Sequence, residues 1–273
     1  TGVQTCALPI SGSGTTADTS APVIAFVNPA EGGYVSGLIL ISGTATDESD
    51  IASVDIKIDD GAWTPLANPG HYWTYQIDTF LMSEGAHTAS ARASDENGYD
   101  STEVTINFTV DQTVPEIAIL SPVHGDIIQG DSLIEGTAAD ENGIRTVLVN
   151  PDQGSQFHDT GETSPWDYLF DSTAAPDGEV IISALAYDNS NLYAITNIAV
   201  IIDNTPPAVS ITSHEDGATV SGSITLQGTS SDSRGIDRVM IKVSGSAEDL
   251  ASGTASWSYP VNTVPLDPVN NPH

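Results

Sequence analysis

Eight aspartates recur at fixed positions along this chain of 273 residues, and their spacing could build cation sites. Each of three segments begins with an aspartate that shortly precedes a proline, and this proline opens a strand-rich stretch. A second aspartate follows the first at the same distance in all three segments, and a third follows at a common distance in two of them. The three sets are Asp18, Asp47 and Asp95; Asp111, Asp140 and Asp188; and Asp203 and Asp232.

Carboxylates that meet at one point need a counter-charge. Two like charges about 4 Å apart repel by roughly 1 kcal/mol in water and by more near protein. Calcium is a hard cation that takes about six to eight oxygen ligands in a flexible geometry. No histidine or cysteine recurs with the aspartates, which disfavours zinc and copper. The sequence therefore predicts calcium where a set converges; the alternative is that these aspartates only form turns with their own backbone.

The aspartates belong to an internal repeat with a period of roughly 93 residues, which is the size of a small domain and too long for a solenoid unit. Apolar residues alternate with polar ones, as at Val54, Ile56 and Ile58, which indicates half-buried strands. About seven short antiparallel strands in a repeat of this length indicate an all-β fold of tandem immunoglobulin-like β-sandwiches. In the first copy we expect strands near 23–27, 38–46, 52–59, 62–66, 72–78, 86–94 and 102–110.

The repeat also predicts the domain boundaries. We expect immunoglobulin-like repeats at 18–111, 112–203 and 204–273. The third copy is predicted to be truncated and poorly stable alone, because the sequence reaches residue 273 where its sixth strand would begin. Residues 1–10 resemble a translated sequencing adapter, an artefact that we exclude from the fold, and residues 11–17 have the composition of a flexible linker.

Three short motifs carry a resemblance to a known family: the Gly-Thr-Ala-x-Asp turn, the Asp-Asn-Thr-Pro-Pro junction and the Ala-x-Asp-x-x-Gly turn that contains Asp95. With these motifs, residues 22–273 resemble the bacterial immunoglobulin-like repeats found in tandem in surface adhesins, biofilm proteins and secreted enzymes. The resemblance implies an extracellular or cell-surface location. It also supports calcium, because some of these families stiffen their junctions with it. The second copy departs at the last turn, where Ser190 and Asn191 replace the usual glycine.

The charge balance limits the partners of the chain. Six lysines and arginines face 37 acidic residues, for a net charge of −31. Such a surface repels nucleic acid and anionic lipid and attracts cations, although solubility or a salty environment would also account for it. No apolar run approaches the roughly 18 residues of a membrane span. The single cysteine, Cys6, lies in the adapter-like segment, so no disulfide framework is expected.

The sequence offers no sign of catalysis, because it lacks a nucleophile elbow, a phosphate loop and a paired-cysteine motif. The leading hypothesis is a non-catalytic structural module, a stalk or spacer of an exported, adhesin-like protein, whose neighbours are the other repeats of the same chain. The alternative is an accessory module of a secreted enzyme that binds carbohydrate or another surface ligand. Its platform would be a repeated Trp-x-Tyr pair, which core packing explains as well. These pairs are Trp73 and Tyr75, Trp166 and Tyr168, and Trp257 and Tyr259.

Overall fold

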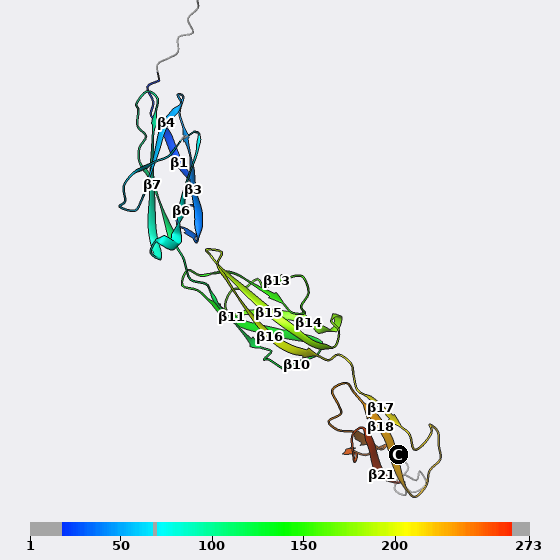
Figure 1. The fold of residues 1–273 in the computed structure, drawn as a ribbon. Coiled ribbons are helices and arrows are strands. Elements are labelled where there is room, and N and C mark those ends of the chain that lie inside the picture. The colour runs from blue at the N-terminus through cyan, green and yellow to red at the C-terminus, as the bar shows by residue number, and fades with distance from the viewer. Residues whose placement is uncertain (1–17, 68–69, 264–273) are drawn as a thin grey trace, which may run out of the picture. The chain divides into compact units, whose positions relative to one another are not determined.

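The structure is a computed structural model that describes residues 18–67 and 70–263. These residues form β-strands and two short 3-10 helices, arranged as β-sandwiches one after another along the chain (Figure 1). The predicted all-β fold of tandem immunoglobulin-like sandwiches is confirmed. The adapter-like segment, the linker at 11–17 and residues 264–273 lie outside the described residues.

The first sandwich packs a three-stranded sheet against a five-stranded one. The three-stranded sheet has the order β1 (Val23–Asn28), β3 (Leu38–Thr46), β6 (Tyr72–Asp78). The five-stranded sheet has the order β2 (Gly33–Val35), β8 (Val104–Val110), β7 (Gly85–Asp95), β4 (Ile51–Ile58), β5 (Thr64–Pro65). The 3-10 helix η1 (Thr79–Leu81) connects β6 to β7.

All seven strands predicted for the first repeat are present, and the structure adds one, β2. This strand is very short and pairs in parallel with β8, so that Val35 lies opposite Val110. A strand of this length cannot show an alternating pattern, and its partner strand lies at the other end of the repeat. The sequence therefore could not reveal it.

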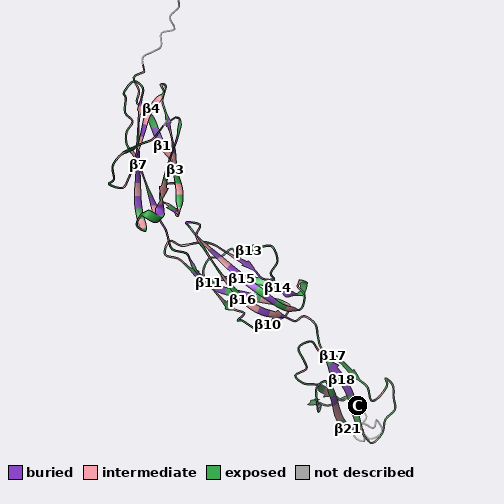
Figure 2. Ribbon diagram, viewed as in Figure 1, coloured by how far each residue is buried: buried purple, intermediate pink, exposed green. Residues whose placement is uncertain are grey.

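The core of the first sandwich follows the alternation in the sequence. Val54 and Ile56 on β4 are buried, and so are Ile106 and Phe108 on β8, while the polar residues between them face outward (Figure 2). Burial of alternate residues is the pattern of a sheet with one face on the core. Asp95, the last residue of β7, and Asp47, which directly follows β3, are thus positioned by strands whose register the core determines.

The second repeat has the same arrangement. Its three-stranded sheet has the order β14 (Trp166–Asp171), β11 (Asp131–Ala139), β9 (Glu116–Ser121). Its five-stranded sheet has the order β10 (Ile127–Ile128), β16 (Tyr193–Ile202), β15 (Gly178–Asp188), β12 (Ile144–Asn150), β13 (His158–Asp159). The 3-10 helix η2 (Ser172–Ala174) occupies the place of η1.

The described part of the third repeat contains two smaller sheets. One has the order β17 (Ala208–Ile211), β18 (Ser223–Ser231), β21 (Ser256–Asn262), and the other pairs β19 (Met240–Lys242) with β20 (Glu248–Leu250). Its hydrophobic cluster of buried residues consists of Val239, Ala251 and Trp257. The order β17, β18, β21 corresponds to β1, β3, β6 of the first repeat.

The chain consists of two compact units, and the boundary between them passes through the second repeat. Residues 127–132 and 171–179 belong with the described residues after 200, and the rest of the second repeat belongs with the first. The predicted domain boundaries at 111/112 and 203/204 stay a prediction.

Candidate metal centre

Three of the predicted aspartates meet at one end of the second repeat. Asp111 follows β8, Asp140 follows β11, and Asp188 is the last residue of β15. One carboxylate oxygen of each lies within 4.8 Å of the other two. Asp111 and Asp188 are fully buried, and Asp140 is half-buried. The sequence spacing thus corresponds to a real convergence of carboxylates in the fold.

Asp111 and Asp140 each use one carboxylate oxygen to form a turn. Oδ1 of Asp111 accepts hydrogen bonds from the amide and the hydroxyl of Thr113, at 3.2 and 3.1 Å. Oδ1 of Asp140 accepts from the amide of Asn142 at 2.8 Å. A side chain that caps its own backbone in this way stabilises the loop, as the turn-forming hypothesis expects. The second oxygen of each carboxylate is not needed for the turn.

Asp188 also uses only one of its two carboxylate oxygens to form a turn, and its other oxygen has no partner among the described residues. Its Oδ1 accepts from the amides of Ser190 and Leu192, at 2.7 and 2.9 Å. Its Oδ2 is buried and has no hydrogen-bond partner among the described residues. Burial raises the pKa of the Asp188 carboxyl; the two amide bonds oppose this, and the charges of Asp111 and Asp140 add to it. A buried carboxylate oxygen without a partner is costly, so it needs a proton or a cation.

The donors of this centre fit a hard cation. The converging atoms are all carboxylate oxygens, and calcium binds carboxylate, carbonyl and water oxygens. The hydroxyl of Ser190 donates to Oδ2 of Asp111 at 2.6 Å, which links the last turn of the second repeat to the aspartate that precedes it. Turn formation leaves Oδ2 of Asp188 unused, so in this residue one oxygen forms the turn and the other is free to bind a cation.

The sequence reasoning noted Ser190 only as a departure from glycine and missed this contact. A signal was present, because position 97 occupies the same place in the first repeat and also carries a hydrogen-bond donor, Asn97. Nδ2 of Asn97 donates to Oδ2 of Asp18 at 3.1 Å. In both repeats this position therefore connects the last turn to the first aspartate.

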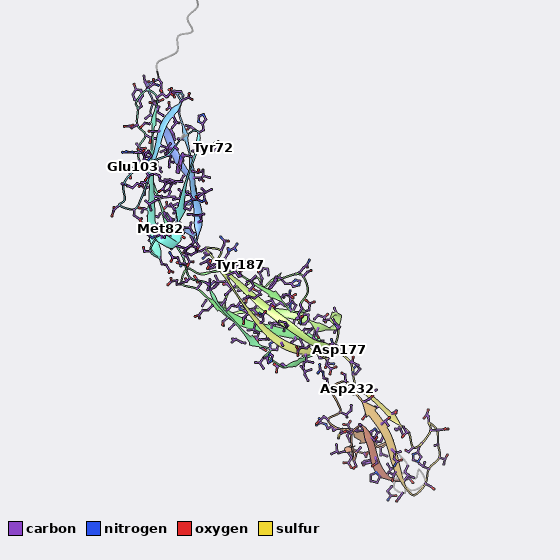
Figure 3. All side chains as sticks on the ribbon, in the orientation of Figure 1. Tyr72, Met82, Glu103, Asp177, Tyr187 and Asp232 are labelled. Carbon is purple, nitrogen blue, oxygen red and sulfur yellow. The ribbon has the colours of Figure 1, made fainter. Side chains whose placement is uncertain are left out.

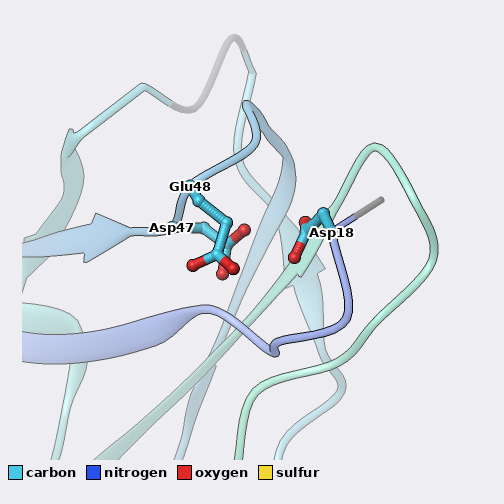
Figure 4. Close-up of side chains that lie close together, drawn as sticks. All are labelled: Asp18, Asp47 and Glu48. Atoms are coloured by element: carbon cyan, nitrogen blue, oxygen red, sulfur yellow. The ribbon is translucent and has the colours of Figure 1, made fainter. Parts of the chain in front are cut away.

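The first set of aspartates converges only in part. Asp18 and Asp47 lie close together, but the third carboxylate within 4.8 Å is that of Glu48, and Asp95 is not a member of this group (Figure 4). Asp95 keeps the hydrogen bonds of its counterpart Asp188, and its Oδ2 is likewise buried without a partner among the described residues. The expectation that Asp95 joins Asp18 and Asp47 is corrected in this respect.

The group at Asp18 is more exposed than the one at Asp111. Asp18 and Asp47 are half-buried and Glu48 is exposed. Hydrogen bonds from the Ser20 amide and the Ser49 hydroxyl hold the pKa of the Asp18 carboxyl well below its usual range. The half-buried, ionised carboxylate of Asp18 is satisfied by its hydrogen bonds and by water, so this group has less need of a cation than the buried one.

The third set does not form a group of three acids within the described part of the chain. Asp232 uses Oδ1 to accept from the amide of Arg234 at 2.7 Å, which is the same turn that Asp140 makes. Oδ1 of Asp203 is buried without a hydrogen-bond partner among the residues that the structure describes. Two aspartates alone are a weaker site than three, because calcium needs more oxygens.

A serine, a histidine and an aspartate also lie together in the first repeat, in an arrangement that could suggest catalysis. Nδ1 of His87 is 2.7 Å from Oδ2 of Asp59, and Nε2 is 3.3 Å from Oγ of Ser83. However, Nε2 lies closer, at 2.8 Å, to the backbone carbonyl of Ser83. Because both ring nitrogens face acceptors, this geometry favours the imidazolium form, which cannot act as a general base. His87 is buried and stacked on Phe108, so the pair is structural.

The sequence matches one protein family three times. The bacterial Ig domain family matches at residues 22–91, 115–184 and 207–271. No curated protein matches the chain.

Two solved structures that are similar to the chain can be named. The fibronectin(III)-like modules of Clostridium thermocellum CbhA have 22% sequence identity, a TM-score of 0.50, and coverage of 67% of this chain and 94% of that one. The tetra-tandem repeat in the extending region of a large adhesion protein has 20% identity, a TM-score of 0.31, and coverage of 89% of this chain and 66% of that one. Because the three family matches span most of its length, the chain belongs to the bacterial Ig domain family.

Proposed function

We propose that this chain is a non-catalytic spacer of an exported or cell-surface protein, and that calcium bound by Asp111, Asp140 and Asp188 stiffens the passage from the first repeat to the second. Tandem bacterial Ig domains are modules of larger proteins, and such repeats are typical of extracellular and surface proteins. The resemblance to adhesin repeats implies that the spacer serves in adhesion.

The buried Oδ2 atom of Asp188 carries the proposal. Without a cation, this oxygen and its two carboxylate neighbours must share a small volume at a cost in free energy. A dication removes the repulsion and supplies the missing partner at once. The acidic surface of the chain, with a net charge of −31, also raises the local concentration of cations.

Asp111 lies between the first and the second repeat, so a cation bound there can affect the stiffness of the connection between them. The amide of Asp111 donates to the carbonyl of Val35 on β2 of the first repeat, at 3.0 Å. Its side chain turns to Ser190 and to the carboxylates of the second repeat. Asp111 is therefore tied to one repeat by its backbone and to the other by its side chain. A cation that fixes the Asp111 side chain would therefore also restrict rotation of the backbone between the first and the second repeat.

The test is a thermal melt of the whole chain with calcium and with chelator, for the wild type, Asp111→Ala and Asp188→Asn. With calcium at 100 times its dissociation constant, the second repeat should gain about 2.7 kcal/mol, because the ion binds only the folded state. Both variants should lose most of that gain. The exposed Asp167, on β14 of the same repeat, supplies the control Asp167→Asn, which should keep it. The absence of a calcium-dependent shift, or an equal loss in the control, would refute the calcium site.

Stiffening needs its own measurement. Small-angle scattering of the wild type should show a narrower distribution of maximum dimensions with calcium than with chelator, and Asp111→Ala should abolish the difference. If calcium stabilises the second repeat but leaves the distribution of maximum dimensions unchanged, the ion stabilises the fold of that repeat and does not stiffen the linker.

The carbohydrate-binding alternative loses the platform on which it was based. Trp73, Trp166 and Trp257 are 1–3% exposed, so their rings cannot stack on a ligand. They are core residues, as packing predicts for large apolar rings. Tyr72 of the first repeat is 81% exposed and lies on the outside of the sandwich (Figure 3). One exposed ring, whose partner in the sequence is buried, does not form a two-ring platform.

A further inference from the structure

In the first repeat, the outer face of the five-stranded sheet carries charged residues that pair with one another. Arg92 on β7 lies opposite Asp55 on β4 and forms an ion pair with it, with Nη2 and Oδ2 2.9 Å apart. Lys57 pairs with Glu103 at 3.2 Å. The ring of Trp63 lies against both cations, 4.7 Å from Nζ of Lys57 and 4.4 Å from Cζ of Arg92. The charges of this face are thus satisfied within the repeat.

The same face of the second repeat is apolar. Leu148 on β12 lies opposite Leu185 on β15, at the cross-strand position that Asp55 and Arg92 occupy in the first repeat. An ion pair in one copy is therefore a leucine pair in the other, on strands of the same order in the sheet. Both leucines are half-buried, so a partner that covers them would add the free energy of burying the rest of their apolar surface.

Other apolar residues continue this face. Ile181 on β15 is 42% exposed, and Ile195 on β16 is 52% exposed. Isolated exposed apolar residues are ordinary, but a group on adjacent strands marks an interaction surface. We call the group of Leu148, Ile181, Leu185 and Ile195 the apolar face.

Two tyrosines and an arginine lie in a row at the end of the apolar face. Tyr193 on β16 and Tyr187 on β15 have ring centroids 5.6 Å apart, and the guanidinium of Arg145 lies 5.3 Å from the ring of Tyr187. Tyr187 marks this end of β15 in Figure 3. Tyr193 is 59% exposed. Tyrosine and arginine are enriched at protein–protein interfaces because they combine large contact area with hydrogen bonding.

We propose that the apolar face and its tyrosine row bind an extended, positively charged protein segment with apolar side chains. The charge of the chain determines this choice, because a second copy would bring another net charge of −31 to the contact. Asp159 on β13 is exposed and lies opposite Leu148. A lysine or arginine of the partner would meet this acid while the partner's apolar residues cover the leucines.

The test is an NMR titration of the whole chain with a synthetic peptide that alternates lysine with leucine, phenylalanine and valine. A second peptide of equal charge has serine at the apolar positions. We expect the first peptide to shift the amides of β12, β15 and β16 and to bind at least about tenfold more tightly than the second. The variant Leu148→Arg/Leu185→Asp places an ion pair at the cross-strand position that holds one in the first repeat, with its cation opposite Asp159, and it should fold. It should lose the preference for the apolar peptide.

Three results of the titration would overturn the proposal: equal binding of both peptides, amide shifts spread over the acidic loops, or an unchanged preference in the double variant. Sedimentation of the peptide-free chain provides a further check. Self-association that the double variant abolishes would mean that a second copy is the occupant, and would also overturn it. The double variant keeps Asp111, Asp140 and Asp188, so this test and the calcium test fail independently.

Discussion

The indole ring of Trp73 lies directly on the backbone of Gly43. A Cβ atom added to Gly43 would come within 2.2 Å of Cζ2 of Trp73 and within 2.2 Å of the carbonyl oxygen of Ala25. The second and third repeats show the same relationship, between Gly136 and Trp166 and between Gly228 and Trp257. The glycine of each Gly-Thr-x-x-Asp turn is thus required by a buried tryptophan, and the turn that holds the second aspartate of each set is tied to the core.

The first prediction is that Gly43→Ala destabilises the first repeat by about 3 kcal/mol or more, because the ring and strand β1 must both move. Chemical denaturation monitored by tryptophan fluorescence measures this. The control is Gly70→Ala in the same repeat, where an added Cβ meets no described atom within 4 Å. Equal effects of the two substitutions would mean that the contact with Trp73 is not limiting.

The second prediction concerns Asp188→Asn in chelator. The side-chain oxygen of asparagine can still accept from Ser190 and Leu192, while its amide nitrogen can donate to the neighbouring carboxylates. We expect the calcium-free second repeat to gain about 1 to 3 kcal/mol, the cost of an unsatisfied buried acceptor. The variant should at the same time lose the response to calcium.

The sign of the pH dependence follows from the raised pKa of Asp188. A folded-state pKa above the unfolded one means that the group contributes most below its unfolded pKa and that this contribution is lost as pH rises through the folded value. The advantage of Asp188→Asn over the wild type in chelator should therefore grow as pH rises from about 4. An advantage that stays constant with pH would show that the Asp188 charge is not the cause.

The third prediction concerns the buried pair of His87 and Asp59. Burial lowers the pKa of His87, but the Asp59 carboxylate and the Ser83 carbonyl outweigh it, so that the pKa is raised. The stability that His87 contributes is present below its unfolded pKa of about 6.5 and is lost as pH rises through the folded value. The first repeat should therefore weaken above about pH 6.5.

The second repeat supplies the matched variant for this test. The buried Val180 follows Trp166 at the same distance in the sequence at which His87 follows Trp73. The variant His87→Val should remove the pH dependence that begins above about pH 6.5. Thermal melts across this range measure it. A wild type and a variant that weaken in parallel would show that other groups are responsible.

The fourth prediction is that Asn204→Ala destabilises the second repeat by about 1 to 3 kcal/mol. Its Nδ2 donates to the carbonyl of Ser172 at 2.9 Å, and its Oδ1 accepts from the amide of Gly130 at 3.0 Å. Removal of the amide leaves both backbone groups without this partner. The exposed Asn197 on β16 is the control, and Asn197→Ala should change the denaturation midpoint little. A comparable loss in both variants would contradict an anchoring role for Asn204.

The sequence alone predicted the repeat, the sandwich class and the strands that show alternation. These features are local, because period-2 burial and the turn residues that separate strands can be read within about ten residues. The aspartates at 111, 140 and 188 were also identified from spacing, since a repeated topology returns equivalent residues to the same end of the sandwich.

Only the tertiary structure decided which atoms meet. It brings Glu48 and not Asp95 to Asp18 and Asp47, and it leaves Oδ2 of Asp188 buried without a described partner. It also joins His87 to Asp59 across 28 residues. Distances of this kind depend on the register of strands remote in the sequence and on how side chains pack between two sheets. No periodic pattern encodes them, because a pattern specifies which face a residue takes and not which oxygen it turns inward.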